Sequence, residues 1–78
     1  MSVWFRRVTG LDTETMREIA EEAGVSWSPE SIIYRKRGIG FADGDADDAT
    51  ALQDAAEEIL GYRPVAIDKP PESDEKQP

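Results

Sequence analysis

The sequence predicts one small α+β domain, in which two helices cover one face of a four-stranded antiparallel sheet. Three observations lead to this prediction. A chain of 78 residues accommodates one domain. Apolar residues recur at helical spacing in two segments, whereas four other segments are rich in β-branched and aromatic residues. Along the chain these segments follow one another as strand, helix, strand, strand, helix and strand.

The first half of the chain predicts a strand, a helix and a loop. An apolar and aromatic run at residues 2–8 favours a strand. Asp12 or Thr13 caps the helix expected over residues 12–23, and Gly24 ends it in a left-handed conformation. The Ser-Trp-Ser-Pro sequence that follows is typical of a loop. The apolar face of the helix consists of Met16, Ile19, Ala20 and Ala23.

The second half predicts a hairpin, a helix and a last strand. Residues 31–37 are rich in Ile and Tyr and favour a strand. A tight hairpin turn at Arg37-Gly38, in which Gly38 supplies the positive φ, would pair this strand with residues 39–42. A helix is expected over residues 43–60, where the first acidic side chains complement the helix dipole. Residues 63–68 favour a last strand. The apolar face of the second helix consists of Leu52, Ala55, Ala56, Ile59 and Leu60.

This order of elements in one short domain is most economically a ferredoxin-like arrangement, the split βαβ fold, over residues 1–68. One face of such a sheet packs against the helices, and no layer covers the other face. Residues 69–78 contain no apolar residue other than proline, and we expect them to form a disordered acidic tail. Function is therefore to be sought on the two faces of the domain.

Composition argues against an enzyme. The chain has no Cys and no His, so it lacks thiolate chemistry, zinc–thiolate sites and the commonest general base. We expect no catalytic residue, no cofactor and no metal. Alternating acids at residues 43–47 are similar to the start of a calcium loop. However, Asp48 stands where that loop needs Gly and Asp54 where it needs Glu, so helix capping is the preferred interpretation.

The sequence also argues against a membrane protein. No apolar stretch approaches the roughly 20 residues that a membrane-spanning helix needs. Residues 1–7 lack the charged lead and the long apolar centre of a signal peptide. We expect a soluble, cytoplasmic protein with no membrane partner.

The charges are sorted along the sequence. The net charge is −8, and the segments expected to be helical contain most of the acids and one base, Arg17. The segments expected to be strands hold most of the arginines together with aromatic residues. Helices packed on one side of a sheet would therefore give the molecule an acidic helical face and a basic, aromatic sheet face. Opposite charge on two faces is a pattern typical of a binding protein.

The first hypothesis places function on the sheet face. Side chains alternate between the two faces of a strand, so Trp4 is exposed on the open face if Val3 and Phe5 face the helices. Phe41 joins it if Gly40 faces the helices. Exposed aromatics stack on unpaired bases while arginines hold phosphates, which predicts a site for single-stranded nucleic acid. The residues of this site are Trp4, Arg6, Tyr34, Arg35, Arg37 and Phe41.

The same segments resemble the RNA-recognition motif family. Residues 3–5 are similar to its first-strand signature, residues 11–24 to its first helix, and residues 37–44 to its third-strand signature. The third-strand positions that match are Arg37, Gly38, Gly40 and Phe41. The resemblance implies a ferredoxin-like fold that binds RNA on its sheet. Ile39 and Gly44 stand where the family has aromatic residues.

The second hypothesis places function on the helices. Their carboxylates would form a negative surface, and such surfaces dock onto the basic channels of proteins that handle nucleic acid. The protein would then be an inhibitor or adaptor of a basic protein partner, similar in charge and size to phage inhibitors of the anti-CRISPR or DNA-mimic type. The candidate residues are Glu18, Glu21, Glu22, Asp47, Asp54 and Glu58.

A third interpretation uses the apolar part of the sheet face for homodimerisation. One observation separates the hypotheses, because Trp4 and Phe41 must be exposed if the sheet binds bases. The alternative register turns Ile39 and Phe41 towards the helices and Gly40 outwards. Burial of these aromatics would favour the acidic helical face.

Overall fold

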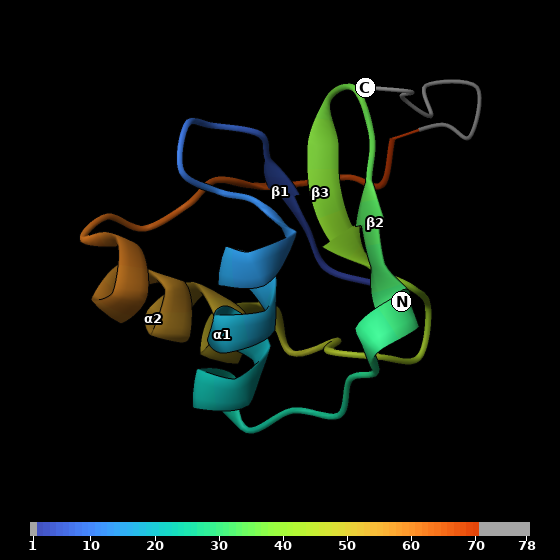
Figure 1. The fold of residues 1–78 in the computed structure, drawn as a ribbon, viewed down its shortest axis with the longest axis horizontal. Helices are drawn as coiled ribbons and strands as arrows, with labels where there is room; N and C mark the ends of the chain where they lie inside the picture. The colour runs from blue at the N-terminus through green and yellow to red at the C-terminus, as the bar shows by residue number, and fades with distance from the viewer. Residues whose placement is uncertain (1, 71–78) are drawn as a thin grey trace.

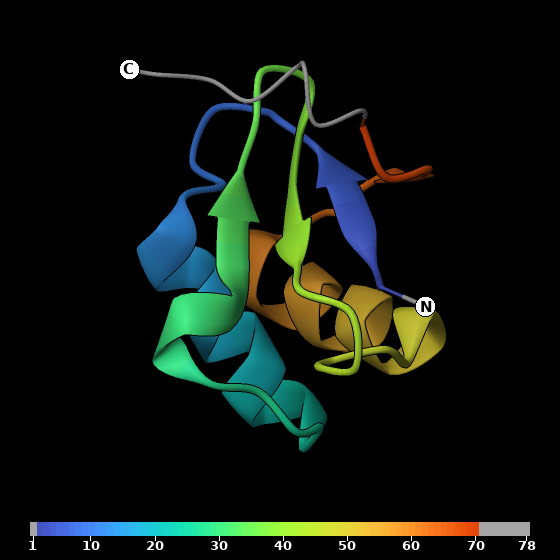
Figure 2. The ribbon, with the colours of Figure 1, turned by 90° about the vertical axis from the view of Figure 1, so that its right-hand side faces the viewer.

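The computed structural model describes residues 2–70, which form two layers (Figure 1). One layer is a four-stranded antiparallel sheet, and the other consists of two helices that lie side by side on one face of it. The predicted α+β class, with two helices and a four-stranded antiparallel sheet, is confirmed. Figure 2 looks onto the sheet from the side that the helices do not cover, with the helices behind the strands.

The sheet consists of short strands that follow the order β2-β3-β1-β4. Each strand pairs with its neighbours in antiparallel fashion, and β1 and β3 are the two central strands. The helices follow β1 and β3 along the chain, and a 3-10 turn, η1 (Pro29–Ser31), precedes β2. The strands are β1 (Trp4–Arg6), β2 (Ile32–Tyr34), β3 (Gly38–Phe41) and β4 (Ala66–Ile67).

The register decides which residues share a face of the sheet. Phe5 is paired with Ile39, and Trp4 is paired with both Gly40 and Ile67. Paired residues point to the same face, and both Phe5 and Ile39 belong to the core beneath the helices. Trp4, Gly40 and Ile67 therefore share the opposite face.

The first helix forms as the sequence predicts. Helix α1 (Thr13–Ala23) is capped by Asp12, whose carboxylate accepts from the Thr15 backbone N–H at 2.9 Å. Gly24 ends it at φ 72°, in the left-handed region that glycine adopts without steric cost. Its buried face consists of Met16, Ile19 and Ala20.

The second helix begins later than the expected residue 43. Helix α2 (Ala49–Leu60) starts after its cap Asp48, because residues 43–46 form a turn and a bend and residues 47–48 are irregular. Ala46 has φ 46°, is buried, and donates its backbone N–H to the Ser26 carbonyl at 2.6 Å. A left-handed residue cannot continue a right-handed helix, so the acids before Asp48 lie in a loop.

The predicted hairpin is also corrected in detail. The Arg35 backbone N–H donates to the Gly38 carbonyl at 2.8 Å, so Lys36 and Arg37 form the turn and Gly38 lies in β3. Gly38 does not have the positive φ expected of it. A Cβ at this position would lie 2.8 Å from the Cδ1 of Ile67 and 3.1 Å from the Phe5 carbonyl oxygen, so a side chain there would require Ile67 to shift.

The core lies between the sheet and the helices. Phe41 is 0% exposed and belongs to it, which contradicts the expectation that Phe41 is exposed on the open face. The register explains this result, because β3 turns its large side chains to the helices and its glycines outwards. The core residues are Val3, Phe5, Leu11, Met16, Ile19, Ala20, Ile39, Phe41, Ala46, Leu52, Ala55 and Ala56.

The expected tail at residues 69–78 lies outside the described residues from position 71 onwards. Its first two residues are described. Lys69 lies 3.7 Å from Asp43, and Pro70 is buried.

Candidate functional site

The sheet face that the helices leave open is covered by other parts of the chain. Trp4 points to this face, as the alternation predicts, but it is only 1% exposed, so its expected exposure is wrong. Its ring lies against Gly40, where any Cβ would clash with the indole. The indole N–H donates to the Ser2 hydroxyl at 3.0 Å.

The Arg35 side chain covers the Trp4 ring on this face of the sheet. Its guanidinium carbon lies 5.1 Å from the centroid of the Trp4 ring, and its side chain is 6% exposed. Its Nη1 donates to the carbonyl oxygen of Pro70 at 2.7 Å, in a buried hydrogen bond. The segment after β4 therefore reaches Arg35 and Gly38 on the open face of the sheet.

The six residues expected to bind nucleic acid are not brought together. Phe41 lies in the core, and Tyr34 packs against the same core on the helical side. Arg6 and Arg37 are exposed, whereas Arg35 is buried beside Trp4. The structure thus provides two exposed arginines but no exposed aromatic platform from this set.

Arg7 plays a role that the sequence did not indicate. Its guanidinium carbon lies 4.1 Å above the Tyr34 ring, and its Nη1 donates to the carbonyls of Arg35 at 3.0 Å and Lys36 at 3.2 Å. It thereby ties the end of the hairpin to the segment after β1. These contacts of Arg7 stabilise the fold.

The acidic side chains of α1 and α2 are exposed on the outer surface of the helical layer. Glu18, Glu21, Glu22 and Glu58 are all exposed, and the Asp54 side chain is 65% exposed. Among the described residues, only Arg17 and Arg63 form ion pairs with carboxylates of these helices. This acidic helical face is therefore mostly open to a cationic partner.

Three of the six acidic candidates lie around one shallow depression between the helices. It has a volume of about 270 Å³, far more than the roughly 10–15 Å³ that one water molecule needs. Carboxylates stand on both sides of it, and alanines from both helices complete its lining. The residues of this interhelical depression are Glu22, Ala23, Ala51, Asp54, Ala55 and Glu58.

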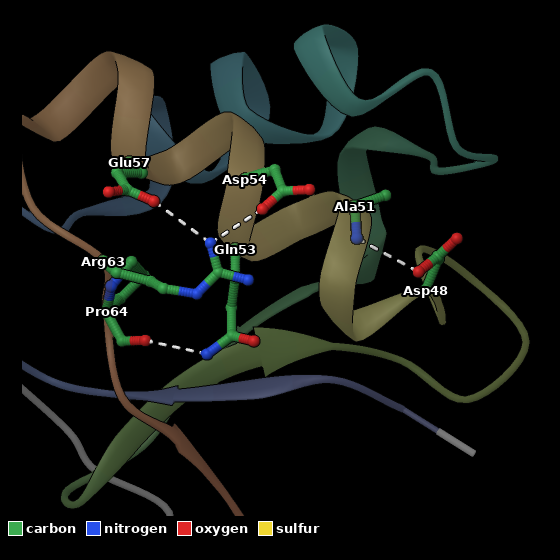
Figure 3. A network of polar contacts seen from close by, with 7 residues as sticks. All are labelled: Asp48, Ala51, Gln53, Asp54, Glu57, Arg63 and Pro64. Atoms are coloured by element: carbon green, nitrogen blue, oxygen red, sulfur yellow. Dashed lines mark hydrogen bonds and ion pairs between the residues drawn. The ribbon is translucent and has the colours of Figure 1, made fainter.

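Arg63 forms ion pairs with α2 that the sequence analysis missed (Figure 3). Its Nη1 donates to Asp54 at 2.7 Å and to Glu57 at 3.1 Å. These hydrogen bonds, first to Asp54 and then to Glu57, raise the pKa of the Arg63 guanidinium above its usual value. Two carboxylates spaced three residues apart lie on the same side of a helix, so their spacing was the available signal. Gln53 next to them donates its amide to the Pro64 carbonyl at 3.0 Å.

The sixth acidic candidate, Asp47, lies elsewhere. It lines a second depression of about 360 Å³, where the start of β1 meets β4 and the N-terminal end of α2. Asp43 lies on the same rim, and a hydrogen bond from the Ser2 side chain, together with Lys69, lowers the pKa of its carboxyl. No group of three potential ligands within residues 2–70 could hold a metal ion.

Neither helix in the described part of the chain has the length and hydrophobicity needed to cross a bilayer. The sequence matches no protein-family model, and it has no significant match among curated proteins or solved structures. The functional argument therefore rests on the geometry of this chain.

Proposed function

We propose that this protein is a non-enzymatic binding module that docks its acidic helical face onto a basic protein. The observation that carries the proposal is the contrast between the two faces. On the sheet face Trp4 is buried with Arg35 over its ring, whereas on the helical face Glu18, Glu22 and Glu58 are exposed. The face that can accept a partner without rearrangement is the acidic one.

The charge of the molecule supports the class of partner. A net charge of −8 on 78 residues opposes binding to nucleic acid and favours a positively charged surface. Complementary charge accelerates encounter and selects among partners. We infer a partner whose basic surface serves nucleic-acid handling, with this protein as its inhibitor or adaptor.

We also propose that the domain has the ferredoxin-like fold and keeps the element arrangement of RNA-recognition motif proteins. The strand order β2-β3-β1-β4 and the placement of one helix after β1 and one after β3 support this proposal. Function does not follow from it, since one fold serves many unrelated activities. Base stacking would need exposed rings at Trp4 and Phe41, and both are buried.

The proposal is tested by reversing charges on the helical face. A triple variant with Glu18→Lys, Glu22→Lys and Glu58→Lys should lose capture of basic nucleic-acid-handling proteins in a pull-down, and wild-type capture should weaken with salt. Glu30→Lys provides a control, because Glu30 is exposed in η1, outside both helices.

Two outcomes would overturn the proposal. One is undiminished capture by the triple variant. The other is salt-sensitive binding of the wild type to mixed single-stranded oligonucleotides, measured by fluorescence anisotropy, which would return function to the arginines of the sheet side.

A further inference from the structure

We propose that the open face of the sheet holds a site for a small phosphate monoester, formed by Arg6 and Arg35 on either side of Gly38. In the structure this phosphate site is closed, because the carbonyl oxygen of Pro70 accepts the hydrogen bond that a phosphate oxygen would accept. The site lies on the face that the proposed function does not use, so the two proposals can fail independently.

The first argument is that the register places both arginines in one row across the sheet. Arg6 of β1 is paired with Gly38 of β3, and the Arg35 backbone N–H donates to the Gly38 carbonyl at 2.8 Å. Paired residues point to the same face. Arg6 follows Trp4 by two positions, so the row lies on the open face that Trp4 occupies. The glycine between the two arginines leaves the middle of the row without a side chain.

The second argument is that Arg35 is a buried cation without an anionic partner. It is 6% exposed, and its Nε is buried with no hydrogen-bond partner. Within residues 2–70, its guanidinium donates to the Pro70 carbonyl and pairs with no carboxylate. A buried charge without a counter-ion is costly, and so is a buried donor without an acceptor. A phosphate group supplies both the missing charge and the missing acceptor.

The third argument is the way in which Pro70 fills the site. Its ring lies over Gly38, where a Cβ would be 3.4 Å from the Pro70 Cγ, and its carbonyl oxygen lies 2.7 Å from the Nη1 of Arg35. A neutral carbonyl leaves the charge of the guanidinium uncompensated. A phosphate compensates that charge and can accept two parallel hydrogen bonds from one arginine. Pro70 is buried, so its segment must lift when the phosphate enters.

The charges on this face define the class of ligand. Arg6 is exposed, and in the described part of the chain it forms no ion pair. Two guanidiniums match a phosphate monoester, which carries a charge of about −1.5 to −2 at neutral pH, better than a singly charged phosphodiester. The net charge of −8 disfavours a long polyanion. The ligand is therefore a small molecule with a terminal phosphate.

The test is an NMR titration of the full chain, labelled with ¹⁵N, with methyl phosphate and with dimethyl phosphate at constant ionic strength. The Nε–H signal of Arg35 reports the site directly. Methyl phosphate should shift this signal and the backbone amide signals of Gly38 and Lys69 in a saturable manner. Dimethyl phosphate is of similar size but carries one negative charge, and it should bind about two- to fivefold more weakly, as the loss of one exposed charge pair allows.

Three variants separate the phosphate site from general attraction of anions. Arg6→Gln removes one charge from the row, and Arg17→Gln removes one charge from α1, where Arg17 pairs with Glu14. Arg6→Gln should weaken methyl phosphate about two- to fivefold, whereas Arg17→Gln should leave its affinity within experimental error. Arg35→Lys keeps the charge but loses the planar fork, and should weaken binding by about tenfold or more. Circular dichroism confirms folding, and the comparison of Arg6→Gln with Arg17→Gln decides even if Arg35→Lys does not fold.

Four results would overturn the phosphate site. They are an Arg35 Nε–H signal that does not shift with methyl phosphate, equal affinities for the two phosphates, equal losses in Arg6→Gln and Arg17→Gln, and full affinity in a folded Arg35→Lys. None of these results bears on the acidic helical face, whose test is the triple charge reversal. If the triple variant retains capture of basic proteins, the proposed function fails while the phosphate site stands.

Discussion

At the scale of single residues, Gly40 determines how the sheet face is built. It lies opposite Trp4 in the register, and the indole packs directly on its backbone. Any side chain at position 40 would need the space of the ring and would also lie 2.6 Å from the Val3 carbonyl oxygen. The glycine that matched a nucleic-acid-binding signature therefore has a packing role in this molecule.

Gly40→Ala should lower the free energy of unfolding by about 1–3 kcal/mol, the usual cost of overpacking a filled site. Urea denaturation followed by circular dichroism measures the loss. The same substitution made in a Trp4→Ala background should cost less, because the indole is no longer in the way. Equal costs in the two backgrounds would contradict a role of the indole and leave the Val3 carbonyl as the group that excludes a side chain.

The residue scale is also where sequence-based prediction reached its limit. Alternation correctly assigned Trp4 and Phe5 to opposite faces of β1, but it left two registers open for β3. Nothing near Phe41 in sequence indicates that it faces the helices. The Trp4 ring is covered by Arg35, which is far away in the chain and donates to Pro70, a residue expected in a disordered tail.

At the scale of elements, local signals predicted the helices better than the strands. Asp12 and Gly24 delimit α1 as expected, since caps act through neighbouring backbone groups. The start of α2 was misplaced because Ala46 adopts a left-handed conformation, which the sequence of an alanine does not indicate. The strands are shorter than their apolar runs because pairing partners limit them.

The cap of α1 predicts a pH dependence. The Thr15 backbone N–H, followed by the Thr15 hydroxyl, donates to the Asp12 carboxylate and lowers its pKa below the usual 3.8. A carboxyl with a lowered pKa in the folded state stabilises that state above about pH 4, and the contribution is lost as the pH falls through the folded-state pKa. Asp12→Ala should therefore reduce stability at pH 7.

The gap between wild type and Asp12→Ala should narrow below about pH 4, as measured by urea midpoints between pH 2.5 and 7. Asp68→Ala is the control, since Asp68 is exposed and lies outside both helices. A gap that stays constant over this range would contradict the assigned role of the ionised carboxylate.

At the scale of the whole molecule, acidic side chains belong mainly to the helical layer and arginines mainly to the sheet layer. The helical layer carries exposed carboxylates, and the arginines of the sheet are partly used inside the protein, as Arg7 and Arg35 show. The charge sorting seen in the sequence persists in space, but its two sides are unequal. The acidic side chains are mostly exposed, while on the basic side Arg7 and Arg35 are bound within the chain and Arg6 and Arg37 are exposed.

Arg63→Gln tests this division. Arg63 occupies Asp54 and Glu57, so its loss leaves both carboxylates to a partner and changes the net charge from −8 to −9. We expect tighter binding of a basic protein, measured by calorimetry at low salt. Arg6→Gln is the control, because it makes the same change of charge on β1, away from α2. Equal gains in both variants would mean that net charge alone governs binding.

The hydrogen bond between Arg35 and Pro70 also has a consequence for how the protein is oriented when it is immobilised on a surface. Pro70 lies on the sheet side, beside Gly38, whereas the carboxylates point away from the other layer. A tether attached at residue 70 would therefore leave from the sheet side and anchor the protein on a sensor surface with its helices towards the solution. An anchor on helical side chains would hide the same carboxylates, so the two immobilisations should give opposite results with one basic analyte.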